Sequence, residues 1–272
     1  MGRRARQKRL KRGRRLRTLA AIVLVSVAAV ALVVVALVGG LLFHNLSSGG
    51  GPPAEPRTAA IVDQVSLYEA NPEFIAAATG LLQGAGYAVD YYPGEGVTVD
   101  LYRELPTHDY DLIVLRSHSA RLRKVWRDEL LDEVVVFTSE PYSPTRWYED
   151  QKAQRLAEVR YYEGGDEYFG IRAEFVRAGM RGEFEGATII LMGCDGLQSQ
   201  TTGQAFLDKG ASAFISWDGP ISWSHSDAAT ERLLELLLIE GLTTEDAVSQ
   251  TEAELGPDPV FGAELRILTG GG

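Results

Sequence analysis

A cysteine and a histidine each lie just beyond an apolar stretch of this sequence, where a buried strand would end. His118 follows residues 110–117 (YDLIVLRS). Cys194 follows residues 187–192 (ATIILM), with one glycine between. An imidazole beside a thiol can take its proton and leave a thiolate, the nucleophile of cysteine chemistry. The pairing predicts acyl transfer, provided that the two strand ends lie side by side.

The residues around this pair extend the expected site. Glycines at 193 and 196 flank the cysteine, permit a tight turn and leave backbone N–H groups free to stabilise an oxyanion. Asp195 follows the cysteine directly and is placed in the same cleft. Glu140, which follows the apolar stretch 134–139 (VVVFTS), is a further candidate for lining that cleft.

Other interpretations of the same residues stay open. A free cysteine at a strand end is usually a small buried apolar residue. His225 is a rival partner for Cys194, because a cysteine followed by a histidine is also the order in amidotransferase-like domains on parallel sheets. There, however, the cysteine turns straight into a helix, whereas the stretch after Cys194 (GLQSQTT) is typical of a loop.

The elements that must hold these residues alternate between strands and helices from residue 58 onward. Apolar runs predict strands, and amphipathic runs with caps predict helices. The expected strands are 59–67, 87–92, 110–117, 134–139, 187–192, 211–217 and 264–269, and the expected helices are 71–83, 171–178, 202–209, 226–240 and 244–255. The order predicts an α/β fold, a mostly parallel sheet flanked by helices, in which sites form at the carboxyl ends of strands. Residues 141–186 are interpreted as an insertion with one helix, and their many aromatic residues as a lid or a substrate groove.

From residue 110 to 252 the chain resembles the caspase–gingipain class (clan CD) of cysteine peptidases, which includes the bacterial CHAT-type domains. The resemblance rests on the order of ATIILMGCDG, GQAFLDKGASAFISW and the helix DAATERLLELLLIEGLTTEDAV. It implies a caspase-like three-layer α/β sandwich, with Cys194 as nucleophile and His118 as its acid/base partner. Ser119 stands where the family usually has the glycine that supplies an oxyanion N–H, and Gly193 stands where it often has alanine.

The resemblance also implies a substrate preference. Caspases carry an arginine after the matching Ser-Trp pair, and it binds an acidic substrate side chain. Here Asp218 follows Trp217, which implies cleavage after Arg or Lys. Other aspartates that could serve equally are Asp63, Asp195 and Asp227.

The N-terminal 57 residues have a different character. Residues 1–17 hold ten of the 27 Lys and Arg and no acidic residue, and residues 18–43 hold no charge. A helix of 26 residues is about 39 Å long, enough to span a hydrocarbon core of ~30 Å. The positive-inside rule places the basic tail in the cytoplasm and the rest outside. A cleaved signal peptide is the alternative, but it would have a shorter apolar region and a small-x-small cleavage site. Residues 44–57 form an expected linker before the domain at 58–272.

Charge limits the partners of the outer domain. All 37 Asp and Glu follow the apolar segment, against 17 of the 27 basic residues, so this part carries a charge of −20. Such a charge argues against nucleic acid as a partner and leaves the bilayer contact to residues 18–43. The single cysteine excludes an intrachain disulfide, and no phosphate loop or zinc motif occurs, so no cofactor or metal is expected.

Three functions follow in order of preference. The first is a membrane-anchored, extracytoplasmic cysteine endopeptidase that acts on a peptide or protein. The second is an inactive domain of the same fold that binds or senses a peptide, which Ser119 would favour. The third is an amidotransferase-like α/β domain.

Overall fold

The computed structural model describes residues 56–126 and 129–270. Residues 56–272 form one compact unit. The predicted tail at 1–17, the predicted span at 18–43 and nearly all of the predicted linker lie outside the described residues. Within the described ranges, no helix is both long and apolar enough to cross a bilayer.

A six-stranded sheet forms the centre of the domain, in the order β10-β9-β8-β3-β1-β2. Five strands are parallel, and β10 runs antiparallel to β9. Their bounds are Thr58–Asp63 (β1), Ala88–Pro93 (β2), Leu112–Arg116 (β3), Thr188–Leu191 (β8), Ala213–Trp217 (β9) and Leu265–Thr269 (β10). Every residue of β3 and β9 is buried, as expected for central strands covered on both faces. The predicted mostly parallel sheet is confirmed.

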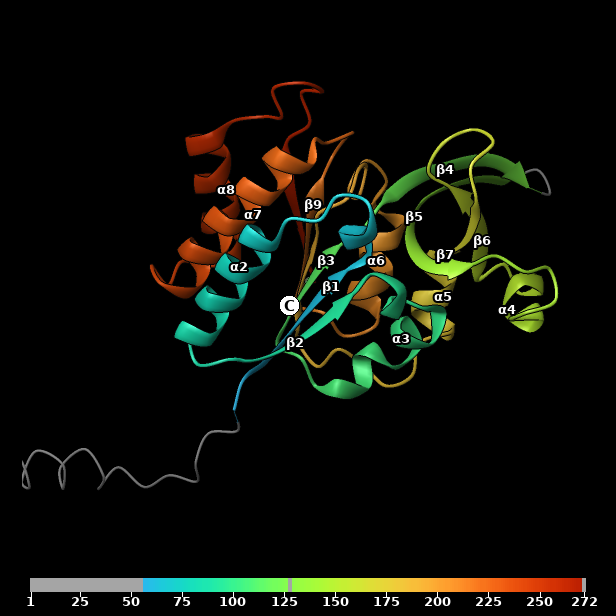
Figure 1. Ribbon diagram of the computed structural model, residues 1–272, viewed down its shortest axis with the longest axis horizontal. Coiled ribbons are helices and arrows are strands. Elements are labelled where there is room, and N and C mark those ends of the chain that lie inside the picture. The colour runs from blue at the N-terminus through green and yellow to red at the C-terminus, as the bar shows by residue number, and fades with distance from the viewer. Residues whose placement is uncertain (1–55, 127–128, 271–272) are drawn as a thin grey trace, which may run out of the picture. The chain divides into compact units, whose positions relative to one another are not determined.

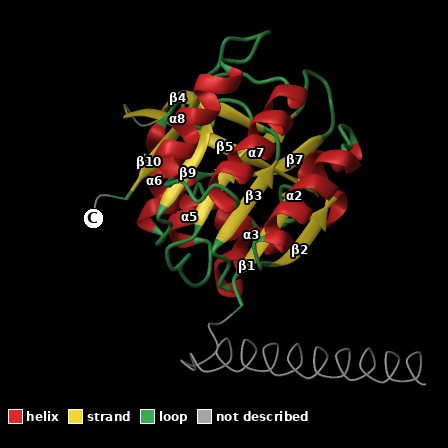
Figure 2. Cartoon of the chain, turned by 90° about the vertical axis from the view of Figure 1, so that its left-hand side faces the viewer, coloured by secondary structure: helices red, strands yellow, loops and turns green. Residues whose placement is uncertain are grey.

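Helices cover both faces of this sheet (Figure 1). One face carries α2 (Pro72–Gly84), α7 (Trp223–Leu238) and α8 (Thr244–Leu255), seen in front of the strands in Figure 2. The other carries α3 (Val99–Glu104), α5 (Ala173–Ala178) and α6 (Gln200–Asp208). A hydrophobic core lies on each face of the sheet, and alternate residues of β1 pack into the two cores. Ala59 and Ile61 pack on the α2 side, and Ala60 and Val62 pack on the α3 side. The flanking helices of the expected α/β fold are therefore confirmed.

A second sheet of four antiparallel strands lies beside the first, in the order β4-β5-β7-β6. The strands are Ser119–Trp126 (β4), Glu129–Pro141 (β5), Leu156–Arg160 (β6) and Glu167–Ile171 (β7), and α4 (Tyr148–Lys152) follows β5. Residues 141–186, where one helix was expected, therefore contain two helices and two strands, α4, α5, β6 and β7. The expected strand at 134–139 lies within β5, whereas β4, β6 and β7 were not predicted. In a strand with one exposed face, charged residues alternate with apolar ones, as in β6 (LAEVR).

Several boundaries also differ from expectation. The first strand ends at Asp63, because a 3-10 turn, η1 (Gln64–Leu67), follows it instead of more strand. Two further short turns, η2 (Gly94–Gly96) and η3 (Leu105–His108), flank α3, which was not predicted. The last helix, α8, has the predicted bounds, and Thr243 caps it by accepting a hydrogen bond from the Asp246 N–H.

Candidate active site

The ends of β3 and β8 lie next to each other at the carboxyl edge of the central sheet. The two strands pair in parallel with Leu115 opposite Leu191. Beyond them, the Met192 N–H donates to the Leu115 carbonyl at 2.9 Å. The Ser119 hydroxyl then donates to the Cys194 carbonyl at 2.6 Å. The segments that carry His118 and Cys194 are thus joined directly by a hydrogen bond.

Glycine is required where these segments meet. A Cβ at Gly193 would lie 2.2 Å from the Ser117 carbonyl and 2.3 Å from the Ser119 hydroxyl. A Cβ at Gly196 would lie 1.9 Å from the Ser216 hydroxyl. Both distances are far too short for any residue that has a Cβ. Glycine at 193 and 196 therefore allows the Cys194 loop to pack directly against Ser117, Ser119 and Ser216.

The Cys194 thiol faces the loop between β9 and α7. Its sulfur accepts from the Ile221 N–H at 3.4 Å and contacts the Ile221 carbonyl at 3.9 Å. Burial raises the pKa of the Cys194 thiol, the Ile221 N–H opposes this, and the carboxylates of Asp195 and Asp258 add to it. The group is therefore a neutral thiol at neutral pH.

The His118 ring is enclosed by aromatic side chains. Ring centroids lie 4.8 Å from Tyr161, 5.3 Å from Trp223 in an edge-on arrangement, and 6.0 Å from Phe137. The buried Gln64 side chain accepts from the backbone N–H of His118 at 3.1 Å and donates to the Tyr161 hydroxyl at 2.5 Å. Burial, and after it the charge of Arg116, lowers the pKa of His118 to about 4. The ring is neutral at pH 7.

His118 and Cys194 share a neighbour instead of a direct bond. Both side chains are described, and no hydrogen bond joins the Cys194 sulfur to a ring nitrogen of His118. Ile221 contacts the thiol, and Trp223, two residues further on, packs against the imidazole. The segment 221–223 therefore lines both reactive groups, and the pair is two neutral partners at one edge of the sheet.

A buried ion cluster fixes the end of β3 just before His118. Arg116 is 1% exposed and donates to Asp63 at 3.0 Å. It also donates twice to Asp227 on α7, at 2.8 and 3.0 Å. Asn71 and Tyr91 add hydrogen bonds to the two carboxylates. The cluster ties β1, β3, α2 and α7 together beneath the site.

The residues predicted to bind substrate lie at different places. Trp217 is buried and donates its indole N–H to Ser226 at 3.1 Å. Asp218 accepts from the Glu264 N–H at 2.8 Å and pairs with the half-exposed Arg266 at 3.0 Å. Asp195 adjoins the thiol, has a left-handed backbone (φ 61°), and its pKa is raised by burial.

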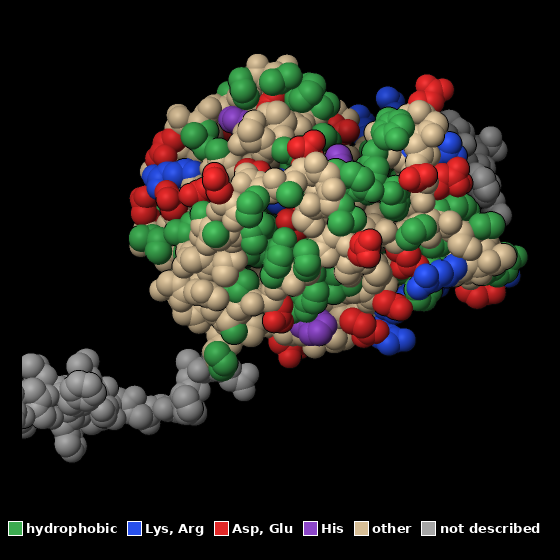
Figure 3. Space-filling view, viewed as in Figure 1, with side chains coloured by type: hydrophobic (Ala, Val, Ile, Leu, Met, Phe, Trp, Pro, Cys, Tyr) green, Lys and Arg blue, Asp and Glu red, His purple; other side chains and the backbone are tan. Residues whose placement is uncertain are grey.

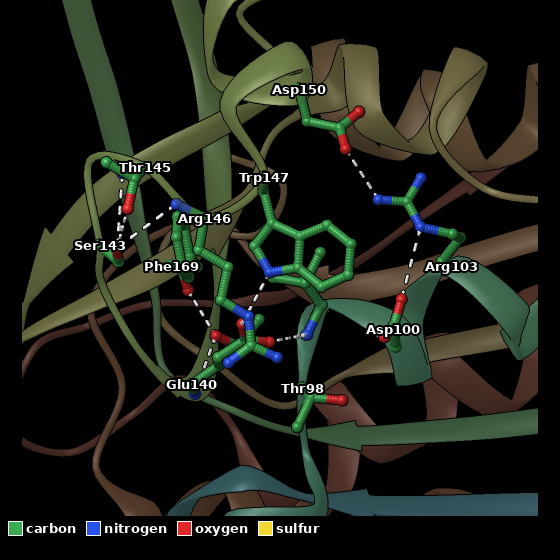
Figure 4. Close-up of polar contacts among 12 residues, drawn as sticks. Thr98, Asp100, Arg103, Glu140, Ser143, Thr145, Arg146, Trp147, Asp150 and Phe169 are labelled. Carbon is green, nitrogen blue, oxygen red and sulfur yellow. Dashed lines mark hydrogen bonds and ion pairs between the residues drawn. The ribbon is translucent and has the colours of Figure 1, made fainter.

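Glu140 holds the second sheet to α3 (Figure 4). Its buried carboxylate accepts from the Val99 N–H at 3.0 Å and from the Trp147 indole at 2.6 Å. Arg146 adds an ion pair at 2.9 Å. None of these contacts involves Cys194 or His118, so the geometry favours an anchoring role for Glu140.

His225, the rival partner, belongs to α7 and is not bonded to the thiol. Its Nε2 lies 3.2 Å from the Gly256 carbonyl, and its ring packs on Trp217 at 5.4 Å. Cys194 leads into a loop, since α6 begins only at Gln200. Within the described ranges, no group of three or more His, Cys, Asp and Glu is arranged to hold a metal.

Sequence reasoning missed four residues of this site. Gln64 lies in the expected strand 59–67, and Ile221 lies in the expected loop after residue 217, so no sequence pattern indicated a role for either. Trp223 lies at the start of a helix that was predicted to begin three residues later. Only Tyr161 carried a signal, as one of the aromatic residues in the segment interpreted as a lid or groove.

Comparison with protein-family profiles and with curated protein sequences gives no match. Among solved structures, the chain is similar to the crystal structure of the Arg-specific cysteine proteinase gingipain R, with a TM-score of 0.42 and 14% sequence identity. The similarity covers 73% of this chain and 42% of that one, so the chain spans less than half of that structure's length. What the fold itself defines is an α/β domain with a three-layer core, and the function has to be argued from the site.

Proposed function

We propose that this chain is a cysteine peptidase with Cys194 as nucleophile and His118 as general base. The observation that carries the proposal is the meeting of the two strand ends, where the Ser119 hydroxyl bonds the Cys194 carbonyl at 2.6 Å. A thiol and an imidazole at one sheet edge, lined by the common segment 221–223, are the groups that acyl transfer requires.

The protonation states support general-base attack. Because the imidazole is neutral, it can accept the thiol proton while the sulfur bonds to the carbonyl carbon of a peptide. The imidazolium then gives this proton to the leaving amine as the C–N bond breaks, which leaves a thioester. Water attacks the thioester with His118 again as base, and the thiol is restored. No thiolate is needed before substrate binds.

Asp218 is the proposed determinant of a preference for Arg or Lys. Its partner Arg266 is half-exposed, and exposed ion pairs contribute only about 0–1 kcal/mol. A basic substrate side chain can therefore replace Arg266 at little cost. The net charge of −20 after the apolar segment also favours a cationic substrate.

The proposal places this chemistry outside the cytoplasm. Residues 18–43 would anchor the chain in the bilayer, and the ten basic residues before them would keep the N-terminus in the cytoplasm. The substrate is then a peptide or protein at the cell exterior.

A peptide library analysed by mass spectrometry tests the proposal. The purified full chain, in a non-ionic detergent, should cut a set of peptides that Cys194→Ala and His118→Ala leave intact. His225→Ala is the matched control and should cut at the parent rate. Cleavage that survives Cys194→Ala would contradict the proposal, and loss of cleavage in His225→Ala would favour the amidotransferase-like arrangement.

A second candidate is a peptide-binding domain without catalysis. It is favoured by the raised pKa of Cys194 and by the contact of the thiol with the Ile221 carbonyl, both of which oppose loss of the thiol proton. In the same experiment, this candidate predicts peptides that bind the chain and are recovered uncut.

A further inference from the structure

A cavity of about 480 Å³ opens between α2 and the carboxyl ends of β1 and β2. Its size falls within the usual range of small-molecule sites, roughly 300–1,000 Å³. Neither Cys194 nor His118 lines it. Asp63, 1% exposed, lies at its inner end, and Tyr91, 41% exposed, lies at its rim. The cavity is therefore separate from the candidate active site, although both lie at the same sheet edge.

The inner end of the cavity carries an excess of negative charge. Asp63 accepts from Arg116 through one oxygen and from the Tyr91 hydroxyl through the other, both at 3.0 Å. Arg116 also serves the carboxylate of Asp227. One buried guanidinium thus faces two buried carboxylates, and no Lys, Arg or His occurs among the residues lining the cavity. Burial raises the pKa of Asp63, the charge of Arg116 opposes this, and the charge of Asp227 adds a smaller increase.

The wall of the cavity is mostly apolar and comes from one stripe of α2. Its residues recur at three- and four-residue intervals, which places them on one side of the helix. They are Pro72, Ile75, Ala76, Thr79, Gly80 and Gln83. On the face drawn in Figure 3, hydrophobic side chains gather over β1 and β2, and acidic side chains lie around them. An apolar body would pack along this wall, and the ring of Tyr91 would receive a cation favourably.

We propose that this cavity binds a small organic cation, an ammonium group carried by a short apolar chain. The ammonium group lies toward the Asp63 carboxylate and the Tyr91 hydroxyl, and the apolar chain lies along α2. The charge of the ligand offsets the excess negative charge, which is strongly felt at this depth because the surroundings are poorly polarisable. This site does not depend on the proposed peptidase activity.

Two glycines of α2 allow a matched test. An added Cβ at Gly80 or at Gly84 would meet no atom within 4 Å, so a larger side chain is tolerated at either position. Only Gly80 lines the cavity. Gly80→Leu should therefore fill the cavity, and Gly84→Leu should leave it open.

Binding is measured by isothermal titration calorimetry on the full chain in a non-ionic detergent, with hexylammonium, hexanol and hexanoate. We expect hexylammonium to bind at least tenfold more tightly than hexanol, and hexanoate to bind most weakly. Gly80→Leu should weaken hexylammonium binding at least tenfold, and Gly84→Leu should not change it. Asp63→Asn should bring hexylammonium and hexanol to equal affinity.

Three results would each overturn the proposal: no binding of hexylammonium, equal affinity for the ammonium and the alcohol in the parent chain, or equal loss in the two glycine variants. If Asp63→Asn does not fold, the comparison of Gly80→Leu with Gly84→Leu still tests whether the ligand binds in this cavity. The titrations of the parent chain with the three ligands still test whether the cavity prefers a cation.

Discussion

The two sheets of the domain contribute different halves of the candidate site. The six-stranded sheet supplies the fixed parts: the thiol after β8, the end of β3, and the buried Arg116 cluster that ties them to α2 and α7. The four-stranded sheet supplies an apolar cover, with Phe137 from β5 and Tyr161 after β6 packed on the imidazole. His118 lies at the junction, one residue before β4 begins.

This difference indicates a division of roles. Charge pairing in the central sheet determines where the reactive groups lie, because burying an unpaired charge is costly. Aromatic packing from the second sheet determines how the imidazole titrates, because it removes water from the ring. Changes in the first sheet should therefore affect folding, and changes in the second should affect chemistry with less effect on folding.

The largest expected effect is on the central sheet. Arg116→Ala removes the guanidinium that bonds both Asp63 and Asp227 and leaves two buried carboxylates facing each other. We expect the free energy of unfolding, measured by urea denaturation, to fall by about 3–5 kcal/mol. Arg266→Ala, which breaks a half-exposed pair, should cost less than about 1 kcal/mol. Equal losses in both variants would contradict the role given to the buried cluster.

A smaller and more local effect is expected in the second sheet. Glu140→Ala leaves the Val99 N–H and the Trp147 indole without their acceptor, at a cost of about 1–3 kcal/mol. Hydrogen exchange should rise in β6 and β7 and stay unchanged in β1 and β3. Glu95→Ala, at an exposed position, is the control. An equal rise in hydrogen exchange in both sheets would show that they do not unfold separately.

The aromatic cover can be tested on the imidazole itself. Tyr161→Ala admits water to the ring, so the pKa of His118 should rise from about 4 toward its ordinary value, by at least about one unit. The neighbouring Tyr162 is 71% exposed, and Tyr162→Ala should leave the pKa of His118 unchanged. Proton NMR titration follows the ring, with His118→Gln used to assign its signal. An unchanged pKa of His118 in Tyr161→Ala would show that packing by the second sheet does not control how the imidazole titrates.

The last expected effect is on stability in acid. The pKa of His118 is about 4 in the folded chain and about 6.5 when unfolded. Between these values the unfolded chain binds more protons, so the His118 contribution to stability is present above pH 6.5 and is lost as the pH falls toward 4. His118→Gln should therefore lose less stability between pH 7 and 4.5 than the parent chain, as measured by urea unfolding. Identical losses would contradict the lowered pKa.

The sequence predicts the central sheet well, because its strands carry their signal in residue type. Runs such as LIVL in β3 and IIL in β8 are apolar throughout, and buried parallel strands require this. Placing His118 and Cys194 after two such runs was enough to bring them to one edge once the strands paired. In the second sheet, β5 contains such a run (VVVF) and was predicted, whereas β4 and β6 mix charged and apolar residues and were not.

The electrostatics of the site were less predictable. Sequence reasoning favoured a thiolate formed in advance by the imidazole, whereas the fold encloses both groups and keeps both neutral. For the imidazole, that outcome depends on burial by Phe137, Tyr161 and Trp223, which come from three separate segments. Only tertiary packing brings them together, so no local pattern could reveal it.

The central claim is that His118 acts as the base for Cys194. It is tested by the rate at which peptidyl acyloxymethyl ketones ending in Arg, Lys or Leu inactivate the full chain, measured from pH 3 to 9. The account predicts covalent attachment at Cys194, an acid limb near pH 4, and a loss of at least about 100-fold in His118→Ala at neutral pH. Near-ultraviolet circular dichroism confirms that the variant is folded. Equal rates in the parent chain and a folded His118→Ala variant would contradict the claim.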